Sequence, residues 1–242
     1  MNRPNWKKVA LIATDIVLGA YIVFTFTAFN KPDERARLCT KVSIDIQDET
    51  TNGFIDTKEI EERLVSSPFV KTAECYKTQD GHVNIRITQR MPTVRVKAVN
   101  GEDYYLDDNN LIMPNSHYTS DLIIATGYIS RWYAQNYIAH LINALTASDL
   151  WRNQIEQVNV LRDYTVELVP RVGNHIIHLG KLPESSQRQQ RKQLVTEFTN
   201  KKMDRLEKFY RYGLSQAGWN KYSYIDLEFD NQIICKKRTL KR

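Results

Sequence analysis

The chain has 242 residues, of which 42% are hydrophobic and 26% are charged, an ordinary balance for a globular protein. This length allows one or two domains with a substantial core. The net charge of +6 at pH 7 is spread along the chain and is denser only at its two ends. Because no segment combines a basic stripe with interleaved aromatic residues, a nucleic-acid-binding function is not expected.

An apolar segment near the N-terminus indicates a membrane anchor. Residues 9–29 are 21 consecutive residues with a single charge, that of Asp15. At about 1.5 Å per residue, a helix of this length spans the roughly 30 Å hydrocarbon core of a bilayer. A signal peptide has a shorter apolar region and a small-x-small cleavage site, so we expect an uncleaved signal-anchor. Asp15 either reaches the membrane interface or makes a polar contact with another transmembrane helix.

Basic residues are equally frequent before and after this segment, so the positive-inside rule gives little preference for an orientation. The absence of acidic residues from the N-terminus slightly favours a cytoplasmic N-terminus. Long domains translocate largely regardless of their charge. We therefore expect residues 1–8 to form a cytoplasmic tail and the body of the protein to lie on the other side of the membrane.

A small domain is predicted after a polar linker over residues 30–38. Residues 39–97 have the pattern strand, helix, hairpin. Asp56 and Glu59 form a capping box at the start of the helix, and Pro68 marks its end. Strands are expected at residues 41–46, 69–78 and 82–90.

Residues 98–235 are predicted to form a larger domain with a mainly antiparallel sheet and two helices, followed by a basic tail over residues 236–242. Further strands are expected at residues 93–98, 103–108, 110–114, 122–129, 155–161, 165–170, 175–180 and 222–237. The helices cover residues 133–151 and 185–215, and the expected inner faces are Ile138, Leu141, Ile142 and Leu145 on the first and Leu194, Phe198, Leu206, Tyr210 and Leu214 on the second. The predicted fold class is α+β.

Signals of enzymatic chemistry are missing from the sequence. It has no Gly-x-Ser-x-Gly, no P-loop and no Gly-rich dinucleotide fingerprint. The adjacent Asp107 and Asp108 lack the twelve-residue pattern of a calcium loop and predict a hairpin turn instead. The histidines, namely His82, His117, His140, His175 and His178, do not cluster with acids at metal-ligand spacing. We therefore predict no catalytic residue, cofactor or metal site.

Three cysteines, Cys39, Cys75 and Cys235, are too few for a disulfide scaffold and too dispersed for a zinc site. Two states are compatible with this spacing. The cysteines are buried free thiols, or Cys39 and Cys75 form a bridge if the first domain lies in an oxidising compartment.

The last predicted strand, residues 222–237, alternates in character with a period of two. Ile225, Leu227, Phe229 and Ile233 form an apolar set, and Tyr222, Tyr224, Asp226, Glu228 and Asp230 form a polar one. A terminal strand is often an edge strand, whose unpaired backbone groups can pair with a partner. This strand therefore either closes the sheet or serves as a docking edge.

The order of these parts resembles the bacterial cell-division family FtsQ/DivIB. Residues 54–70 resemble the helix of its POTRA domain, and residues 83–96, with Arg90-Met91-Pro92, are similar to its link between domains. Residues 103–114 resemble its hairpin, with Asn110 where the family has Gly, a residue that also accepts left-handed geometry. Residues 209–237 are similar to the end of the family.

This resemblance implies a non-enzymatic scaffold of the divisome at the bacterial inner membrane, with a POTRA domain and a β domain outside the cytoplasm. It implies FtsB/DivIC-like and FtsL-like partners, and no nucleic acid or small-molecule substrate. The last strand is expected to accept a strand of the partner, with Phe229 at the aromatic contact position. The residues implied in partner binding are Tyr224, Asp226, Glu228, Phe229, Asp230, Asn231 and Gln232. The acids among them predict a partner strand that bears Lys or Arg.

Two other functions are compatible with the sequence. A POTRA-containing envelope assembly or chaperone factor would be expected to carry tandem POTRA repeats or a barrel, and depletion of it should make the envelope permeable. A membrane-anchored hydrolase without a recognised motif is the other alternative. Depletion of a divisome scaffold should instead give filaments of unseptated cells.

Overall fold

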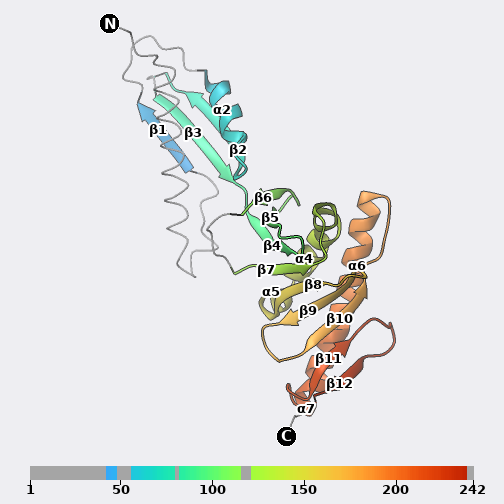
Figure 1. Ribbon diagram of the computed structural model, residues 1–242. Coiled ribbons are helices and arrows are strands. Elements are labelled where there is room, and N and C mark those ends of the chain that lie inside the picture. Colours follow the sequence, from blue (N-terminus) through green and yellow to red (C-terminus); the bar gives the residue numbers. More distant parts are fainter. Residues whose placement is uncertain (1–41, 48–55, 80–81, 116–120, 239–242) are drawn as a thin grey trace. The chain divides into compact units, whose positions relative to one another are not determined.

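The computed structural model describes residues 42–47, 56–79, 82–115 and 121–238 (Figure 1). The predicted anchor over residues 9–29 and Cys39 lie outside these ranges. Among the described residues, no helix is both long enough and apolar enough to cross a bilayer. The chain divides into two compact units, and residues 67–69 and 90–242 make up the second.

The first unit is a three-stranded antiparallel sheet with one helix, as the sequence predicts. Its elements are β1 (Val42–Gln47), α2 (Thr57–Val65), β2 (Val70–Lys77) and β3 (His82–Gln89), with the sheet order β1-β3-β2. The Asp56 side chain accepts hydrogen bonds from the backbone N–H groups of Lys58 and Glu59, so the predicted cap is confirmed. The core consists of Leu64, Val70, Cys75, Val83, Ile85 and Ile87.

The second unit is built on one nine-stranded sheet, whose order is β12-β11-β10-β9-β8-β7-β4-β5-β6. The strands are β4 (Pro92–Ala98), β5 (Asp103–Asp107), β6 (Ile112–Pro114), β7 (Ile123–Gly127), β8 (Ile155–Val160), β9 (Thr165–Pro170), β10 (Ile176–Lys181), β11 (Tyr222–Asp226) and β12 (Ile234–Lys237). The pairs β4–β7, β7–β8 and β10–β11 are parallel and the other five pairs are antiparallel, so the sheet is mixed.

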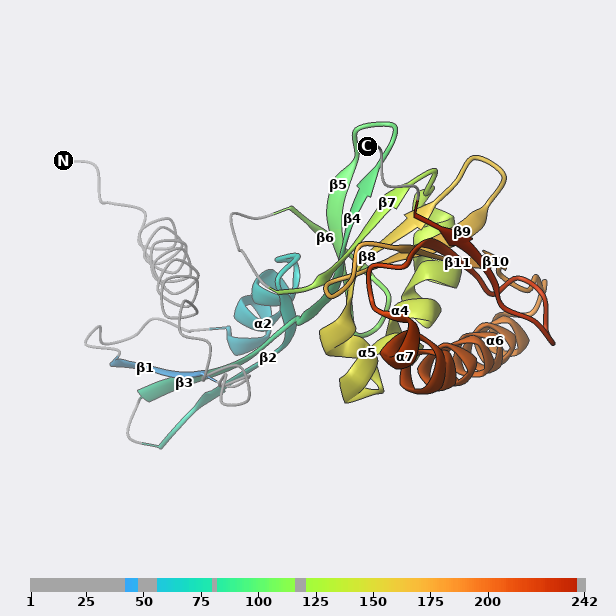
Figure 2. The ribbon, with the colours of Figure 1, turned by 90° about the horizontal axis from the view of Figure 1, so that it is seen from below.

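Helices lie along one face of this sheet (Figure 2). They are α3 (Arg131–Tyr133), α4 (Ala139–Thr146), α5 (Asp149–Gln154), α6 (Arg188–Phe209) and α7 (Ser215–Ala217), with π-helical turns η2 (Ala134–Ile138) and η3 (Tyr210–Leu214). Ile138, Leu141, Ile142 and Leu145 are buried as predicted. On α6 the inner face is rotated from the prediction, because Val195 and Thr199 are buried whereas Leu194 and Phe198 are only half-buried.

Two segments differ from the sequence-based description. Strand β4 pairs with β5 and β7, so residues 92–97 lie in the second unit and not in the first. Residues 222–237 form two strands joined by a turn, because β11 ends at Asp226 and β12 begins at Ile234. The turn follows from local chemistry, since the Asp226 carboxylate accepts a hydrogen bond from the Glu228 N–H at 2.8 Å, and Asp230-Asn231 are turn-forming residues.

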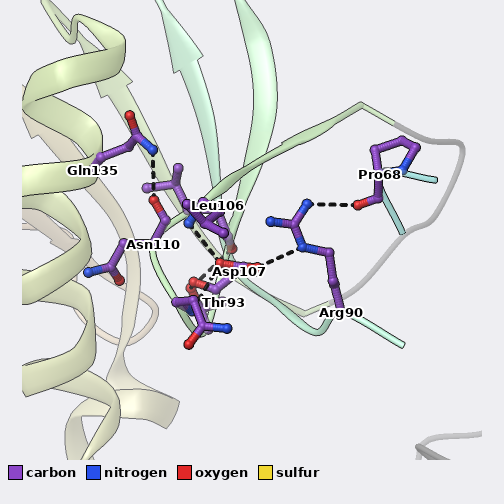
Figure 3. Close-up of polar contacts among 9 residues, drawn as sticks. Pro68, Arg90, Thr93, Leu106, Asp107, Asn110 and Gln135 are labelled. Carbon is purple, nitrogen blue, oxygen red and sulfur yellow. Dashed lines mark hydrogen bonds and ion pairs between the residues drawn. The ribbon is translucent and has the colours of Figure 1, made fainter. Parts of the chain in front are cut away.

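A fully buried carboxylate, Asp107, organises the β5–β6 hairpin (Figure 3). Its Oδ1 accepts hydrogen bonds from the N–H groups of Asn109 at 2.9 Å and Leu111 at 2.7 Å. Its Oδ2 accepts a hydrogen bond from Arg90 Nε at 2.9 Å, and the same guanidinium donates to the Pro68 carbonyl at 3.0 Å. An ion pair between Arg90 and Asp107 therefore connects the two sequence motifs that resemble the family.

We expect Asp107→Asn to lower the free energy of unfolding by about 3 kcal/mol, because it removes the negative charge that pairs with Arg90 and replaces the acceptor of the Arg90 Nε–H with an amide NH2 donor. Urea denaturation measures this change. The exposed neighbour offers a matched control, since Asp108→Asn should change stability by no more than about 0.5 kcal/mol. Equal effects of the two substitutions would contradict the role given to the Asp107 carboxylate.

A buried histidine supports the helix layer behind the sheet. His175 is 3% exposed, and its Nε2 lies 2.7 Å from the hydroxyl of Tyr210. Burial, together with the nearby charge of Arg238, lowers the pKa of His175 below its ordinary value. The neutral imidazole is therefore the form that the folded protein stabilises.

This shift makes stability depend on pH in a defined direction. The unfolded chain takes up the proton near pH 6.5 and the folded chain only at lower pH, so stability is complete above about pH 6.5 and falls as the pH decreases below it. We expect His175→Gln, whose amide still reaches Tyr210 but does not titrate, to reduce the slope of unfolding free energy against pH below 6.5. An unchanged slope in urea denaturation series would contradict this assignment.

Candidate functional site

The structure places the predicted partner-binding residues in a hairpin rather than on an edge strand. Tyr224 and Asp226 lie in β11, which is paired on both sides, by β10 and by β12. The prediction that this strand forms the edge is therefore wrong, because β12 is the terminal strand of the sheet. The other predicted residues, Glu228, Phe229, Asp230, Asn231 and Gln232, lie in the loop between the two strands.

Hydrogen bonds at the end of β11 define which way its backbone faces. The N–H of Leu227 donates to the carbonyl of His178 in β10 at 2.8 Å. Successive residues of a strand present their backbone groups to opposite sides, so Ile225 also faces β10. Tyr224 and Asp226 consequently face β12, where they pair with Lys236 and Ile234.

The same argument defines the free side of β12. The N–H of Arg238 donates to the carbonyl of Lys221 at 3.0 Å, so Arg238 faces inward across the hairpin. By alternation Lys236 also faces β11, whereas Cys235 and Lys237 direct their backbone N–H and C=O groups away from the sheet. These two residues present the donors and acceptors that another strand would need.

Helix α6 holds the loop that leads into this edge. The ammonium of Lys202 donates to the carbonyls of Leu227 at 2.6 Å and Glu228 at 2.7 Å. Arg205 donates to the Gln232 carbonyl at 2.6 Å, and Lys201 forms an ion pair with Asp230 at 3.0 Å. Both ends and the middle of the loop are thus bound to one helix.

Lys202 is the buried member of this group, with a side chain that is 3% exposed. Burial lowers its pKa, and the carboxylate of Asp230 acts in the opposite direction. A buried ammonium is tolerated only where acceptors replace water, and here two backbone carbonyls do so. Lys202 therefore fixes the point where the chain leaves β11.

The loop exposes apolar surface beside the edge strand. Phe229 is 49% exposed, and Ile234, the first residue of β12, is 48% exposed. The side chains of Asn231 and Gln232 are also exposed. This surface is suited to binding a peptide, because it combines an aromatic side chain, an aliphatic side chain and two amides with the unpaired backbone groups of β12.

Acidic side chains gather on the sheet face that the helices leave uncovered. Tyr224 donates to Glu167 at 3.2 Å, and burial raises the pKa of Tyr224. Ligand atoms of His178, Asp226 and Glu228 all lie within 4.8 Å of one another, and residue spacing does not indicate this grouping of two chain segments. Imidazole and carboxylate groups are ligands for divalent cations, although the Asp226 carboxylate already accepts a hydrogen bond from the Glu228 N–H.

Sequence reasoning missed the residues that support the loop. Lys202 and Arg205 occupy a long polar helix, and their charges give no signal of burial. The sequence predicts one continuous strand up to Lys237 and a basic tail from residue 236, so it does not place Lys236 and Lys237 on a separate edge strand, although lysines are common on edge strands. The Asp230-Asn231 pair was the available signal, since it predicts a turn within residues 222–237.

The fold and the comparisons define a mixed α+β protein with a POTRA-like domain followed by a β-rich domain. Residues 55–88 match the POTRA-like domain, and residues 91–236 match the family described as FtsQ/DivIB, C-terminal related. Since the second match covers more than half of the 242 residues, the chain belongs to the FtsQ/DivIB family. A search of curated proteins finds no match to the chain.

Membership in this family confirms the resemblance seen in the sequence. FtsQ/DivIB proteins are membrane-anchored, non-enzymatic proteins of cell division. The family assignment indicates a scaffold role among divisome proteins in general.

We expect Lys202→Met to release the loop, because the carbonyls of Leu227 and Glu228 lose their charged donor while the aliphatic part of the side chain is kept. The free energy of unfolding should fall by about 1–3 kcal/mol, and amide hydrogen exchange at residues 228–233 should accelerate. Lys201→Met removes an exposed charge one residue away and should cost at most about 1 kcal/mol. Unchanged exchange in the Lys202 variant would show that this contact does not order the loop.

Proposed function

We propose that the chain is a divisome scaffold that binds an FtsB/DivIC-like partner by strand addition to β12. The observation that carries this proposal is the terminal position of β12 in the nine-stranded sheet, with Cys235 and Lys237 facing outward. Strand addition obtains affinity from main-chain hydrogen bonds and specificity from alternate side chains. An FtsL-like protein is a second partner, bound through the FtsB/DivIC-like chain.

The charge of the edge favours an acidic partner strand. Lys236 and Lys237 lie in β12, and Arg238 follows directly. Two of the acids that the sequence suggests for this purpose are engaged within the chain, since Asp230 pairs with Lys201 and Asp226 accepts a hydrogen bond from the Glu228 N–H. The earlier expectation of a partner bearing Lys or Arg is therefore replaced by a partner bearing Asp or Glu.

The loop before β12 supplies the second part of the proposed surface. Phe229, Asn231 and Gln232 are exposed there and are available for side-chain contacts. A partner that extends beyond β12 would reach this loop, because the loop leads directly into Ile234. Phe229 is the proposed hydrophobic anchor of the interface.

The remaining parts follow the order of the sequence. In this proposal residues 1–8 are cytoplasmic, residues 9–29 cross the inner membrane once, and the POTRA-like and β domains lie outside the cytoplasm at the division site. The POTRA-like domain serves recruitment to that site, and the β domain binds the partner.

We expect Lys237→Pro to abolish capture of the FtsB/DivIC-like partner. Proline removes the outward N–H of the edge and places its ring where the partner strand would lie, while the inward pairing of Lys236 with β11 is kept. Pull-down with the full-length protein measures capture, and circular dichroism verifies that the variant is folded.

Lys237→Ala is the matched control, because it removes the charge and keeps the N–H. Its affinity should fall by no more than about tenfold, the range of a surface ion pair. Equal capture by the wild-type protein and the folded proline variant would exclude strand addition at β12.

A further inference from the structure

A second polar site lies where the β5–β6 turn meets α4 and the start of α6. The β5–β6 and β11–β12 hairpins are at opposite ends of the sheet. A cavity of about 430 Å³, open to solvent on one side, is lined there by residues of these three elements. Its volume falls within the range of small-molecule sites in proteins, roughly 300–1,000 Å³. Nothing in the partner-binding proposal uses it.

The wall formed by the turn is held in place by hydrogen bonds. Asn110 adopts a left-handed backbone with a φ of 63°, and its carbonyl accepts a hydrogen bond from Gln135 at 3.0 Å. The buried Asp107 carboxylate organises the same turn. Asn109, Asn110 and Asn143 thereby line the cavity with amide groups on a fixed frame.

The start of α6 contributes positive charge to the cavity. This 22-residue helix has no side-chain hydrogen bond at its N-cap, Gln187, and no acidic residue in its first turn. The first N–H groups of any helix lack intrahelical partners, and here the N-cap side chain does not replace them. The helix dipole adds a partial positive charge at this end. Arg188 and Lys192 line the cavity next to these N–H groups.

A buried histidine completes the site. His140 is 5% exposed and lines the cavity, and among the described residues no hydrogen-bond partner contacts its ring. Burial, with the charges of Lys192, Arg191 and Arg188, lowers the pKa of His140. The neutral ring still carries one N–H donor, which a ligand in the cavity can accept.

We propose that this cavity binds a phosphate group, as a phosphomonoester or a phospholipid headgroup. Arg188 supplies a guanidinium that matches two phosphate oxygens, Lys192 adds a point charge, and His140 and the first N–H groups of α6 donate hydrogen bonds. Asp108 also lines the cavity and is its one acidic residue. The volume leaves room for the organic group attached to the phosphate.

A carboxylate ligand fits less well than phosphate. Two cationic side chains, a helix N-terminus and a neutral imidazole converge on the cavity, and one carboxylate offers only two oxygens to these donors. A phosphate monoester offers three oxygens and carries a charge between about −1.5 and −2 at neutral pH.

Isothermal calorimetry with the full-length protein tests this proposal, with phenyl phosphate as the soluble probe and benzoate as the carboxylate probe. Vesicles of phosphatidylcholine with or without phosphatidic acid form a third arm, measured by co-sedimentation. We expect phenyl phosphate or the phosphatidic acid vesicles to bind and benzoate to bind at least about tenfold more weakly. The arm that binds more tightly identifies the source of the phosphate.

The variant Arg188→Gln/Lys192→Gln should weaken binding of that probe by about tenfold or more, as expected for the loss of two charged hydrogen bonds. Lys208→Gln/Arg211→Gln is the matched control, because it removes two charges from the other end of the same helical segment. His140→Gln should also weaken binding without changing net charge. Absence of phosphate binding, equal binding of benzoate, or equal weakening by the control variant would overturn the proposal.

Discussion

The buried ammonium of Lys202 is the contact on which the arrangement of the C-terminal hairpin depends. It binds the carbonyls of Leu227 and Glu228 at the point where β11 stops, and Arg205 binds the carbonyl of Gln232 before β12 starts. Together with the turn at Asp226, these contacts hold the chain where it turns back along β11. As a result β12 becomes the edge of the sheet, and Phe229 is exposed at the loop.

An exposed edge strand has to attract one partner and avoid pairing with other copies of itself. In the proposed function Lys236 and Lys237 serve both needs, because positive charges repel an identical strand and attract an acidic one. The acids of the hairpin play another part. Asp230 pairs with Lys201, and Asp226 accepts a hydrogen bond from the Glu228 N–H, so these two acids stabilise the loop within the chain and leave the edge basic.

Much of the fold follows from sequence patterns. The cap at Asp56, the alternation of Val83, Ile85 and Ile87, and the apolar face around Leu141 all depend on local periodicity, and each is confirmed. The features that the sequence did not predict are the turn after Asp226 and the contacts between distant segments. The apolar alternation predicts a strand that continues through Phe229, but Asp226 and Asp230-Asn231 form a turn there, and Lys202 on α6 stabilises this turn through the carbonyls of Leu227 and Glu228. The His178–Asp226–Glu228 group and the cavity beside His140 likewise join segments that lie far apart in the sequence.

The most direct test of the partner-binding surface is photo-crosslinking in living cells, with a crosslinking amino acid placed at one position of the full-length protein at a time. Positions 237 on β12 and 229 in the loop probe the proposed surface, and position 114 on β6 probes the opposite edge of the sheet. Strand addition at β12 predicts a crosslink to an FtsB/DivIC-like protein from positions 237 and 229 and none from position 114. A crosslink to that protein from position 114, with none from 237, would contradict the proposed function.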